Sequence, residues 1–305
     1  MPKQISFFLF GTLLSTLLLN ACQHVQQQEP QPQPAALSVP DNLRDTKTPH
    51  SLIVLDESIN FDLIKKQGQG PSERLIRWGT KESPGYWRTF TYDPAGKLLG
   101  IFQEEYGWQT VELARYQGDF LAESFTREAQ SGFVFRFKRY QYDAQGRLSR
   151  TLLYGRGLDK QNQFRLSDWL THTYDAKGEL QQVRFESNSM PSFYWVYTYQ
   201  KGDCVRQQQY RRASGGKVDD LREQIDIAYS SQINPLMELP LYDEYKYRFS
   251  RHYQAASVTT LYQSGTAERA PGCEFRGNFE YDGQGRLSRM RLSEGNLWEY
   301  FTYAP

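Results

Sequence analysis

The chain has 305 residues, with 36 basic and 35 acidic side chains that give a formal net charge of +1. This balance provides no overall attraction to nucleic acid or to an anionic surface, so the composition argues against a nucleic-acid-binding protein. Aromatic residues make up 15% of the chain, with 21 tyrosines and 18 phenylalanines against 4 methionines. Aromatic side chains interleaved with polar ones suit half-buried β-strands, and the composition therefore predicts an all-β protein.

The first 21 residues have the pattern of an export signal. Lys3 precedes an apolar run over residues 7–19, which is too short for a comfortable membrane-spanning helix of about 20 apolar residues. The run ends in Leu19-Asn20-Ala21-Cys22, which resembles the lipobox of bacterial lipoproteins. The resemblance implies cleavage before Cys22, attachment of a diacylglyceryl group to its sulfur, and acylation of the new amino group, for example with palmitate. An ordinary cleaved signal and an uncleaved anchor are the alternatives.

Residues 22–50 are predicted to form a lipidated linker. After Cys22 the chain is rich in glutamine and proline as far as Pro40, and such a sequence buries too little apolar surface to offset its ordering entropy. We therefore predict a spacer between the lipid and a folded body at residues 51–305. Gln23 stands where an aspartate often retains lipoproteins at the inner membrane, so the resemblance favours a lipid-anchored protein of the cell envelope, at the outer membrane.

Four segments of the body share the pattern Tyr-Asp-x-x-Gly-(charged)-Leu. An aspartate that opens a four-residue turn accepts hydrogen bonds from backbone amides, and a glycine takes the positive-φ position at little cost. Each segment therefore predicts a tight turn between antiparallel strands, with its aspartate as a turn cap rather than part of a calcium or acid array. The motif residues are Tyr92, Asp93 and Gly96, then Tyr142, Asp143 and Gly146, then Tyr174, Asp175 and Gly178, and finally Tyr281, Asp282 and Gly285.

The predicted strands alternate aromatic with polar residues at a period of two. Phe193, Trp195 and Tyr197 fall on one face of a strand, which indicates a sheet with one packed face. Weaker copies of the motif lie between the four clear ones. The packed face is the preferred interpretation of the aromatic rows, and exposed rows that bind a sugar or a partner's peptide are the alternative. The decisive residues are Trp78, Trp87, Trp108, Trp169, Trp195 and Trp298.

The four motifs resemble the YD repeats of RHS proteins and teneurins, over about residues 78–305. The resemblance implies a long antiparallel meander that can curl into a shell. We therefore predict an antiparallel meander of YD-type hairpin repeats, arranged as an open or curled single sheet. A shell that encloses a toxin needs a far longer chain with a toxin domain after the repeats, so toxin delivery is not expected.

Cys204 and Cys273 are a candidate disulfide. An exported protein meets an oxidising compartment in which two such cysteines can bond. They stand 69 positions apart, for which the chain-entropy treatment gives a stabilisation of about 4 kcal/mol. Two free thiols are the alternative, and a redox site is disfavoured because no Cys-x-x-Cys spacing is present.

The sequence indicates no catalytic residues, no metal site and no cofactor. Its four histidines lack metal-ligand spacing, and it has neither a nucleophile elbow nor a phosphate-binding glycine loop. We predict a non-catalytic scaffold or binding module that reaches the membrane through its lipid anchor and binds an envelope protein or glycan. The alternative is a hydrolase or carbohydrate-binding protein acting on envelope polysaccharide, because paired carboxylates on separate loops are invisible in sequence. The sequence does not predict an oligomeric state.

Overall fold

The computed structural model contains seventeen β-strands, two short 3-10 helices and no α-helix in the part of the chain that it describes. No helix in that part is long and apolar enough to cross a membrane. The predicted signal peptide, Cys22 and the linker as far as residue 37 lie outside the described residues. The described ranges are 38–45, 49–54, 59–80, 86–156, 163–212, 219–233, 250, 252–263, 266–292 and 298–305.

Sixteen of the strands form a meander of antiparallel hairpins, in which each strand pairs with the next one along the chain. The first eight are β2 (Leu75–Thr80), β3 (Tyr86–Tyr92), β4 (Leu98–Glu105), β5 (Trp108–Gln117), β6 (Phe120–Glu128), β7 (Val134–Tyr142), β8 (Leu148–Arg156) and β9 (Gln163–Tyr174). The others are β10 (Leu180–Ser187), β11 (Phe193–Gln200), β12 (Asp203–Arg211), β13 (Asp220–Ile233), β14 (His252–Gln263), β15 (Thr266–Tyr281), β16 (Leu287–Leu292) and β17 (Trp298–Tyr303).

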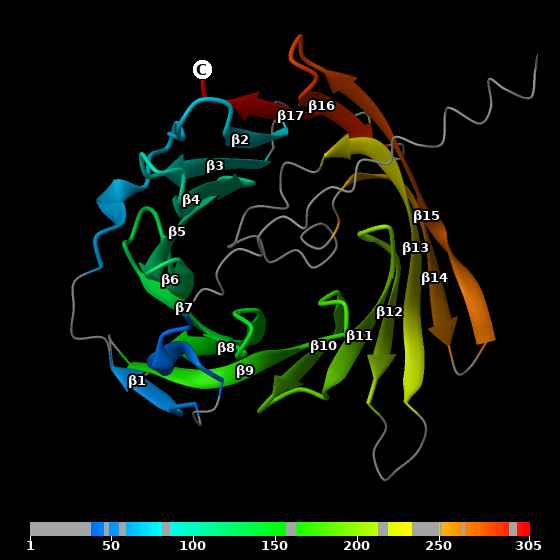
Figure 1. Ribbon diagram of the computed structural model, residues 1–305, viewed down its shortest axis with the longest axis horizontal. Helices are drawn as coiled ribbons and strands as arrows, with labels where there is room; N and C mark the ends of the chain where they lie inside the picture. Colours follow the sequence, from blue (N-terminus) through cyan, green and yellow to red (C-terminus); the bar gives the residue numbers. More distant parts are fainter. Residues whose placement is uncertain are drawn as a thin grey trace, which may run out of the picture. The chain divides into compact units, whose positions relative to one another are not determined.

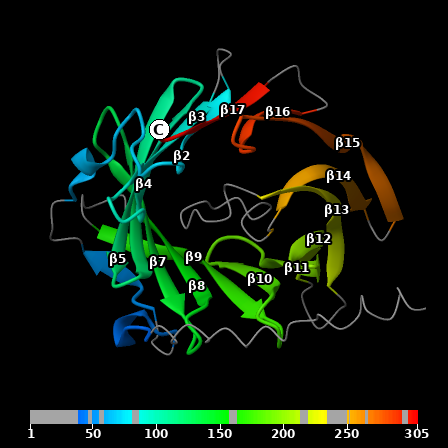
Figure 2. The same ribbon diagram turned by 45° about the horizontal axis from the view of Figure 1, so that its top comes forward.

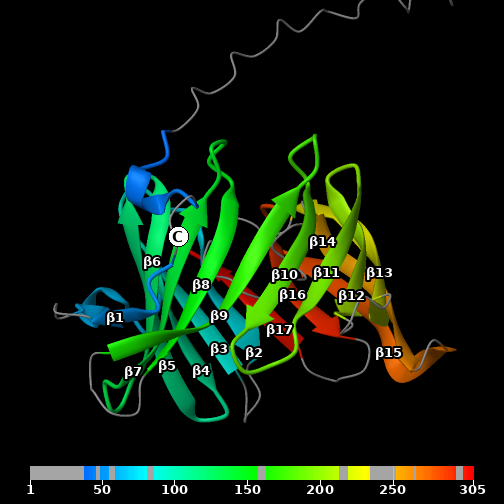
Figure 3. The ribbon, with the colours of Figure 1, turned by 90° about the horizontal axis from the view of Figure 1, so that it is seen from below.

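The two ends of this meander meet and close it into a barrel. β17 pairs with β2, with Phe301 opposite Trp78 and Thr302 opposite Arg77. Figures 1 and 2 show the two strands side by side, and Figure 3 shows the ring from another side. The predicted open or curled single sheet was therefore wrong, and the fold is a closed sixteen-stranded antiparallel barrel. Closure gives hydrogen-bond partners to backbone groups that an open sheet would leave at two edges.

An N-terminal strap, made of the described residues between 38 and 71, lies on the outside of this barrel. Its short strand β1 (Leu52–Val54) pairs with the first residues of β9, and it carries the 3-10 helices η1 (Asp41–Leu43) and η2 (Phe61–Leu63). Both views show η2 outside the ring (Figures 1 and 2). Leu43, which falls in the predicted linker, is buried against the barrel.

The strap identifies the two faces of the wall. Phe61 of the strap packs with Phe102 and Val111 in one buried cluster, so these strand residues face outward. Successive side chains of a strand point to opposite faces, and Ile101 accordingly packs with Phe90 in a second cluster inside the barrel. Strands β2–β9 therefore bury apolar side chains on both faces.

Beyond the strap, several outward positions of β10–β17 carry charged side chains, while others carry Tyr194, Val196 and Trp298. Arg206 on β12 bonds Asp226 on β13 through Nε and Oδ1 at 2.6 Å. On β16, Arg289 binds Glu280 of β15 through two nitrogens at 2.7 and 2.8 Å. These ion pairs are partly exposed, so the outer wall carries charge at these two places.

The four predicted turn motifs lie at hairpin turns of one geometry. In the second motif the carbonyl of Asp143 accepts from the Gly146 amide at 3.0 Å, and the Asp143 amide donates to Arg147 at 2.9 Å. Gly146 has a φ of 77°, as a type I turn followed by a left-handed residue requires. The extra residue shifts the register so that Tyr142 pairs with Leu148. The same backbone bonds occur at Asp93, Asp175 and Asp282.

A tyrosine hydroxyl near the end of a strand donates a hydrogen bond to a backbone carbonyl of the preceding strand. We call this bond the tyrosine clasp. Tyr174 Oη donates to the carbonyl of Leu148 at 2.8 Å. The charged residue of the preceding turn motif, Arg147, lies over the same tyrosine ring at 4.6 Å from its centroid. Equivalent clasps join Tyr92 to Leu75, Tyr142 to Leu121, Tyr229 to Cys204 and Tyr303 to Leu287.

The clasp is missing after the third motif. That motif carries Glu179 where the other three carry lysine or arginine. A basic residue alone does not bring a clasp, because Tyr116, which lies beside Lys97 of the first motif, makes no such bond in the described part of the chain. The buried hydroxyl of the following tyrosine, Tyr199, has no hydrogen-bond partner among the described residues. The chain thus contains its own comparison between a clasped and an unclasped tyrosine.

Closure predicts that cysteines at paired positions of β2 and β17 will bond. Residues opposite each other in antiparallel strands have Cα atoms about 4.5–5.5 Å apart, within the range of about 4.4–6.8 Å that a disulfide spans. We expect Arg77→Cys with Thr302→Cys to form a bridge on mild oxidation, detected by mass spectrometry of non-reduced peptides. Thr198→Cys with Thr302→Cys, on β11 and β17, is the matched control and should stay unlinked. Equal linking in both pairs would contradict a closed barrel.

The clasp predicts unequal costs for removing two tyrosine hydroxyls. Tyr174→Phe leaves the Leu148 carbonyl without its partner and should lower the free energy of unfolding by about 1–2 kcal/mol. Tyr199→Phe removes a hydroxyl that has no partner, and stability should stay the same or rise. Urea unfolding of the two variants measures the difference, and a larger loss for Tyr199→Phe would show that the clasp does not stabilise the wall.

Candidate functional site

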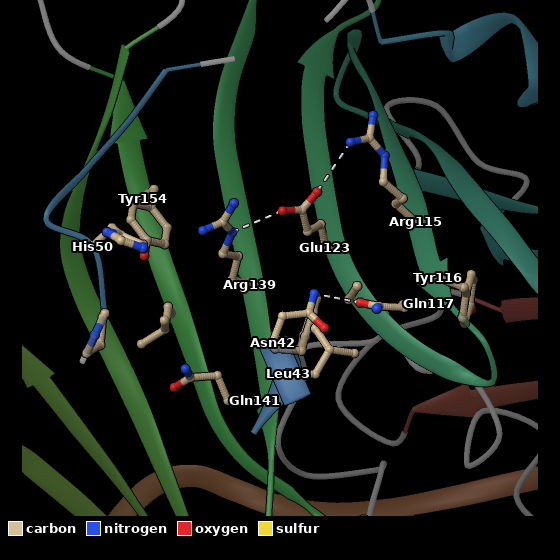
Figure 4. A pocket seen from close by; sticks show the side chains of 14 residues that line it. Asn42, Leu43, His50, Arg115, Tyr116, Gln117, Glu123, Arg139, Gln141 and Tyr154 are labelled. Carbon is tan, nitrogen blue, oxygen red and sulfur yellow. Dashed lines mark hydrogen bonds and ion pairs between the residues drawn. The ribbon is translucent and has the colours of Figure 1, made fainter. Parts of the chain in front are cut away.

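A cavity of about 460 Å³ lies on the outer wall, between strands β5–β8 and the N-terminal strap (Figure 4). Its volume falls within the range of about 300–1,000 Å³ that is usual for small-molecule sites. We call it the strap cavity. It is lined by Asn42, Leu43, Pro49, His50, Arg115, Tyr116, Gln117, Ala122, Glu123, Arg139, Tyr140, Gln141, Leu152 and Tyr154.

Strand register places a row of three charges across the cavity. Arg115 on β5 lies opposite Glu123 on β6, which lies opposite Arg139 on β7. Residues directly opposite each other in antiparallel strands share a face of the sheet. Arg139 Nε lies 3.0 Å from Glu123 Oε1 and Arg115 Nη1 lies 3.4 Å from Glu123 Oε2. Two guanidinium groups therefore share one carboxylate.

Two buried phenylalanine rings on the outer face of the wall contact the two arginines. The guanidinium of Arg115 lies 5.0 Å from the ring centroid of Phe125, and that of Arg139 lies 5.5 Å from that of Phe137. The two rings stack on each other at 4.9 Å between centroids. Cation–π contact and the shared carboxylate orient the guanidinium groups, which remain about two-fifths exposed toward solvent.

Two buried polar atoms of the lining have no hydrogen-bond partner within the described part of the chain. They are the hydroxyl of Tyr154 and Oε1 of Gln141, and the two residues are only 1% and 7% exposed. Burial raises the pKa of the Tyr154 hydroxyl, with a smaller opposing effect from Arg139, so the group stays protonated. An unpaired buried polar atom costs about 1–3 kcal/mol. These two atoms therefore indicate hydrogen-bonding capacity that a bound molecule would satisfy.

The strap forms the opposite side of the cavity. Asn42 Nδ2 donates to Gln117 Oε1 on β5 at 2.7 Å. Leu43 packs with Val39 and Ala122 in a small buried cluster. Figure 4 shows Arg139 between Tyr154 and Glu123, with Asn42 and Leu43 close to the row.

The turn motifs and the strap cavity are different sites. Each motif joins an odd-numbered strand to the following even-numbered strand, so the four turns are spaced around one rim of the barrel. Among the described residues, no group of three or more histidines, cysteines or carboxylates is placed to hold a metal ion. The aspartates cap their own turns, as Asp143 Oδ1 does by accepting from the amides of Gln145 and Arg147.

The six tryptophans do not form one exposed row. Trp78 and Trp195 are buried on the inner face, and Trp87, Trp169 and Trp298 are half-buried. Trp108 is 52% exposed and lies beside the ring of Phe135. Most of the aromatic side chains that the sequence places on one strand face therefore pack within the wall.

The structure does not form the predicted disulfide. Cys204 has a free, buried thiol that donates to the carbonyl of Arg206 at 3.3 Å. It lies on β12, whereas position 273 lies on β15, so β13 and β14 separate the two. Three steps of about 4.8 Å between strands exceed the Cα separation of about 7 Å that a disulfide tolerates. The side chain of Cys273 is outside the described residues.

Sequence reasoning missed the cavity residues and one further pair. Arg115, Glu123 and Arg139 belong to no motif, and only the register of three strands brings them together. The only signal is that each occupies an outward position in an alternating strand. His252 Nδ1 lies 2.7 Å from Asp203 Oδ2, although the two are 49 positions apart in the chain.

Neither protein-family models nor the sequences of curated proteins match the chain. Among solved structures it is similar to a porin-like protein from Bacteroides uniformis, with 12% identity and a TM-score of 0.46, over 77% of this chain and 99% of that one. A porin-like protein from Bacteroides vulgatus gives 9% identity and a TM-score of 0.41, over 76% and 99%. The structure of TcdB2-TccC3-Cdc42 gives 16% identity and a TM-score of 0.30, over 68% of this chain and 12% of that chain. The chain thus spans about an eighth of that last chain, and these values are too low to assign a function.

Burial of Cys204 predicts a loss of stability in alkali. Burial raises the pKa of its thiol from 9.0 to about 12, so the folded state keeps a proton that the unfolded chain releases above pH 9. The stabilisation is complete below pH 9 and is lost between pH 9 and pH 12, at up to about 1.4 kcal/mol per pH unit. The free energy of unfolding should therefore fall more between pH 8 and pH 10.5 in the wild type than in Cys204→Ala. An equal fall in both proteins would show that the thiol is not protected.

Proposed function

We propose that the protein is a lipid-anchored barrel of the bacterial envelope that acts as a non-catalytic binding module. In this proposal Cys22 carries the lipid, and the barrel stands beside the membrane rather than within it. The observation that carries the proposal is the presence of exposed ion pairs on the outer wall, between β12 and β13 and between β15 and β16.

The outer wall is suited to water. Arg206 and Asp226 are 47% and 41% exposed, and Arg289 and Glu280 are exposed to a similar extent. A barrel that spans a membrane presents an apolar band about 25 Å tall, and an arginine at its midplane costs about 2–4 kcal/mol. Insertion of the barrel into a membrane would place ion pairs from two separate parts of the outer wall in the hydrocarbon, at a cost in free energy.

The inner wall combines apolar clusters with some buried charged groups, such as the ion pair of Lys138 with Glu112. Phe90 and Ile101 lie in a buried inner cluster near β3, and Val183 and Trp195 lie in another near β10. Porin interiors are polar because they are filled with water. The inner apolar clusters differ from a water-filled lumen, and in this proposal attachment to a membrane comes from another part of the chain. The lipobox-like sequence at Cys22 supplies such a part.

The strap cavity favours binding over hydrolysis. Both carboxylate oxygens of Glu123 are engaged by arginines, which leaves neither oxygen free to act as a nucleophile or proton donor. A glycosidase places two working carboxylates on either side of its substrate. A glycan or envelope protein as binding partner therefore fits this site better than a polysaccharide substrate.

Lipid attachment and membrane insertion give different results when the linker is cut. We expect radioactive palmitate to label the wild type and not Cys22→Ala. A recognition sequence for a specific protease, inserted after Gln28, should allow the protease to release the barrel from isolated membranes into the supernatant. The chain without the insertion is the control. A barrel that stays in the membrane after cleavage would contradict the proposal, and so would an unlabelled wild type.

A further inference from the structure

We infer that one rim of the barrel rests on the surface of a phospholipid bilayer, through apolar side chains at its turns. The inference rests on the proposed function for the presence of a membrane beside the barrel. It adds which part of the barrel touches that membrane.

The barrel has two rims that carry different turns. The motif rim holds the connections from odd-numbered to even-numbered strands, among them the four turn motifs. The opposite rim, which we call the apolar rim, holds the connections from even-numbered to odd-numbered strands. Three of these connections are described throughout, namely β4–β5, β6–β7 and β10–β11. In Figure 3, η1 (dark blue) lies at the upper end of the wall, on the motif rim, and β1 lies nearer the apolar rim.

Exposed apolar side chains are concentrated on the apolar rim. Among the described residues, nine large apolar side chains are exposed, and the seven at this rim are 42–69% exposed. Each of the three described turns supplies one of them, and the others stand at the adjoining strand ends. They are Tyr106 (β4–β5), Phe133 (β6–β7), Met190 (β10–β11), Trp108 at the start of β5, Leu52 and Val54 on β1, and Leu261 near the end of β14. Protein surfaces usually scatter such residues singly, so this concentration marks a contact surface.

The motif rim has a different character. Its turn tips are small or polar, as at Ala144 and Gln145 in the second motif and at Lys201 between β11 and β12. Tyr281 is the one large apolar side chain exposed there within the described part of the chain, and Leu63 on η2 completes the nine. Both rims consist of turns that meet solvent, so the fold by itself does not require the difference.

The arrangement of the exposed side chains fits a flat partner. They stand on β4–β7, on β1 beside β9, on β10–β11 and on β14, and so are spread around much of the ring. Successive tips of a ring reach a plane together, whereas a peptide or a small ligand would contact one or two of them at a time. Tryptophan and tyrosine rings are favoured at the interface between a bilayer and water. A phospholipid surface therefore suits both the shape and the residue types of this rim.

A basic side chain beside an aromatic tip suits the headgroup layer. The guanidinium of Arg156 lies 4.0 Å from the ring centroid of Phe133. Such a side chain covers apolar surface with its stem and keeps its charge among polar groups. Glu105 and Glu128 end β4 and β6 at the same rim, so the rim does not select strongly for anionic lipid, and a zwitterionic bilayer is a suitable partner.

The linker is long enough for the apolar rim to reach the membrane that holds the anchor. The described chain begins at Ser38 beside the motif rim, where Val39 packs with Phe120, the first residue of β6. The 16 residues from Gln23 to Ser38 span at most about 55 Å. A strand of ten residues such as β5 spans about 33 Å. A tether that starts at the motif rim can therefore pass the height of the wall to a bilayer under the other rim.

Contact through the rim alone is reversible. Only parts of a few side chains would enter the headgroup region, and even a whole myristoyl chain binds a bilayer marginally. The anchor makes the contact effective because it holds the rim at a high local concentration beside the bilayer. A barrel that is freed by cutting the linker therefore still leaves diluted membranes.

A fluorescent label at three matched positions tests the inference. Gln130 lies in the β6–β7 turn on the apolar rim, Gln145 lies in the second motif on the motif rim, and Gln208 lies on the outer wall in β12. Each is replaced by cysteine in the full-length protein carrying Cys204→Ala and Cys273→Ser, labelled with nitrobenzoxadiazole, and reconstituted into phosphatidylcholine vesicles. Lipid that bears a nitroxide near its headgroup should quench the label at Gln130 and leave the labels at Gln145 and Gln208 bright.

Two substitutions assign the contact to the apolar side chains. Tyr106→Asn together with Trp108→Thr should lower the ratio of docked to undocked protein at the Gln130 label by about tenfold or more, because two rings no longer bury apolar area. Asparagine suits the φ of 48° at position 106, and threonine suits a strand. Leu63→Asn, which removes an exposed apolar side chain away from the rim, is the matched control and should leave the quenching unchanged.

Absence of quenching at Gln130 would overturn the inference, and so would equal quenching at Gln145 or full quenching in the Tyr106→Asn, Trp108→Thr variant. Emission at Gln130 that varies with protein concentration and not with the nitroxide lipid would assign the rim to a second copy of the chain and would overturn it too. Strong quenching at Gln208 would place the wall within the bilayer and contradict the proposed function as well. Palmitate labelling reports the anchor separately, so failure of the rim contact is distinguishable from failure of the anchor.

Discussion

A tyrosine hydroxyl that donates to a backbone carbonyl of the preceding strand recurs around the barrel at five positions in the described residues, and the arrangement of the wall depends on it. A hairpin turn fixes only the two strands that it joins. The clasp from Tyr174 to Leu148 acts at the other end of the connection, across β8 and β9. Arg147 then covers the same ring, so the turn of one hairpin contacts the strand that belongs to the next. Successive hairpins are thereby held at a repeated offset, which is what a closed ring of sixteen strands requires.

The turns were predictable from sequence because their physics is local. An aspartate three positions before a glycine specifies backbone bonds within five residues, and Asp143 and Gly146 make these bonds. Closure was not predictable in this way. Nothing in Leu75–Thr80 or Trp298–Tyr303 distinguishes a strand at an open edge from one that pairs with the far end of the chain. Whether a meander curls or closes depends on the summed stagger of all its strands, which no single segment encodes.

The same reasoning explains which site residues were missed and which pair was mistaken. Arg115, Glu123 and Arg139 form a row only because three strands meet in one register, and a shift of one residue would turn one of them to the inner face. The disulfide between Cys204 and Cys273 was predicted only from the oxidising compartment of an exported protein and from the presence of two cysteines in the folded body. In a meander, distance depends on how many strands intervene, and two strands separate β12 from β15.

The N-terminal strap has a mechanical consequence. It precedes every strand of the barrel in the chain, and it is held on the wall by β1, by the buried side chains of Phe61 and Ile64, and by Leu43. A force applied to the amino-terminal end of the chain therefore enters the fold through the strap before it reaches any strand of the ring. The contacts of Leu43 would yield first, and those of β1 and Phe61 would follow. Stepwise loss of these contacts would lower the force that reaches the closed sheet. Loss of the Leu43 contacts would also open the cavity beneath the strap.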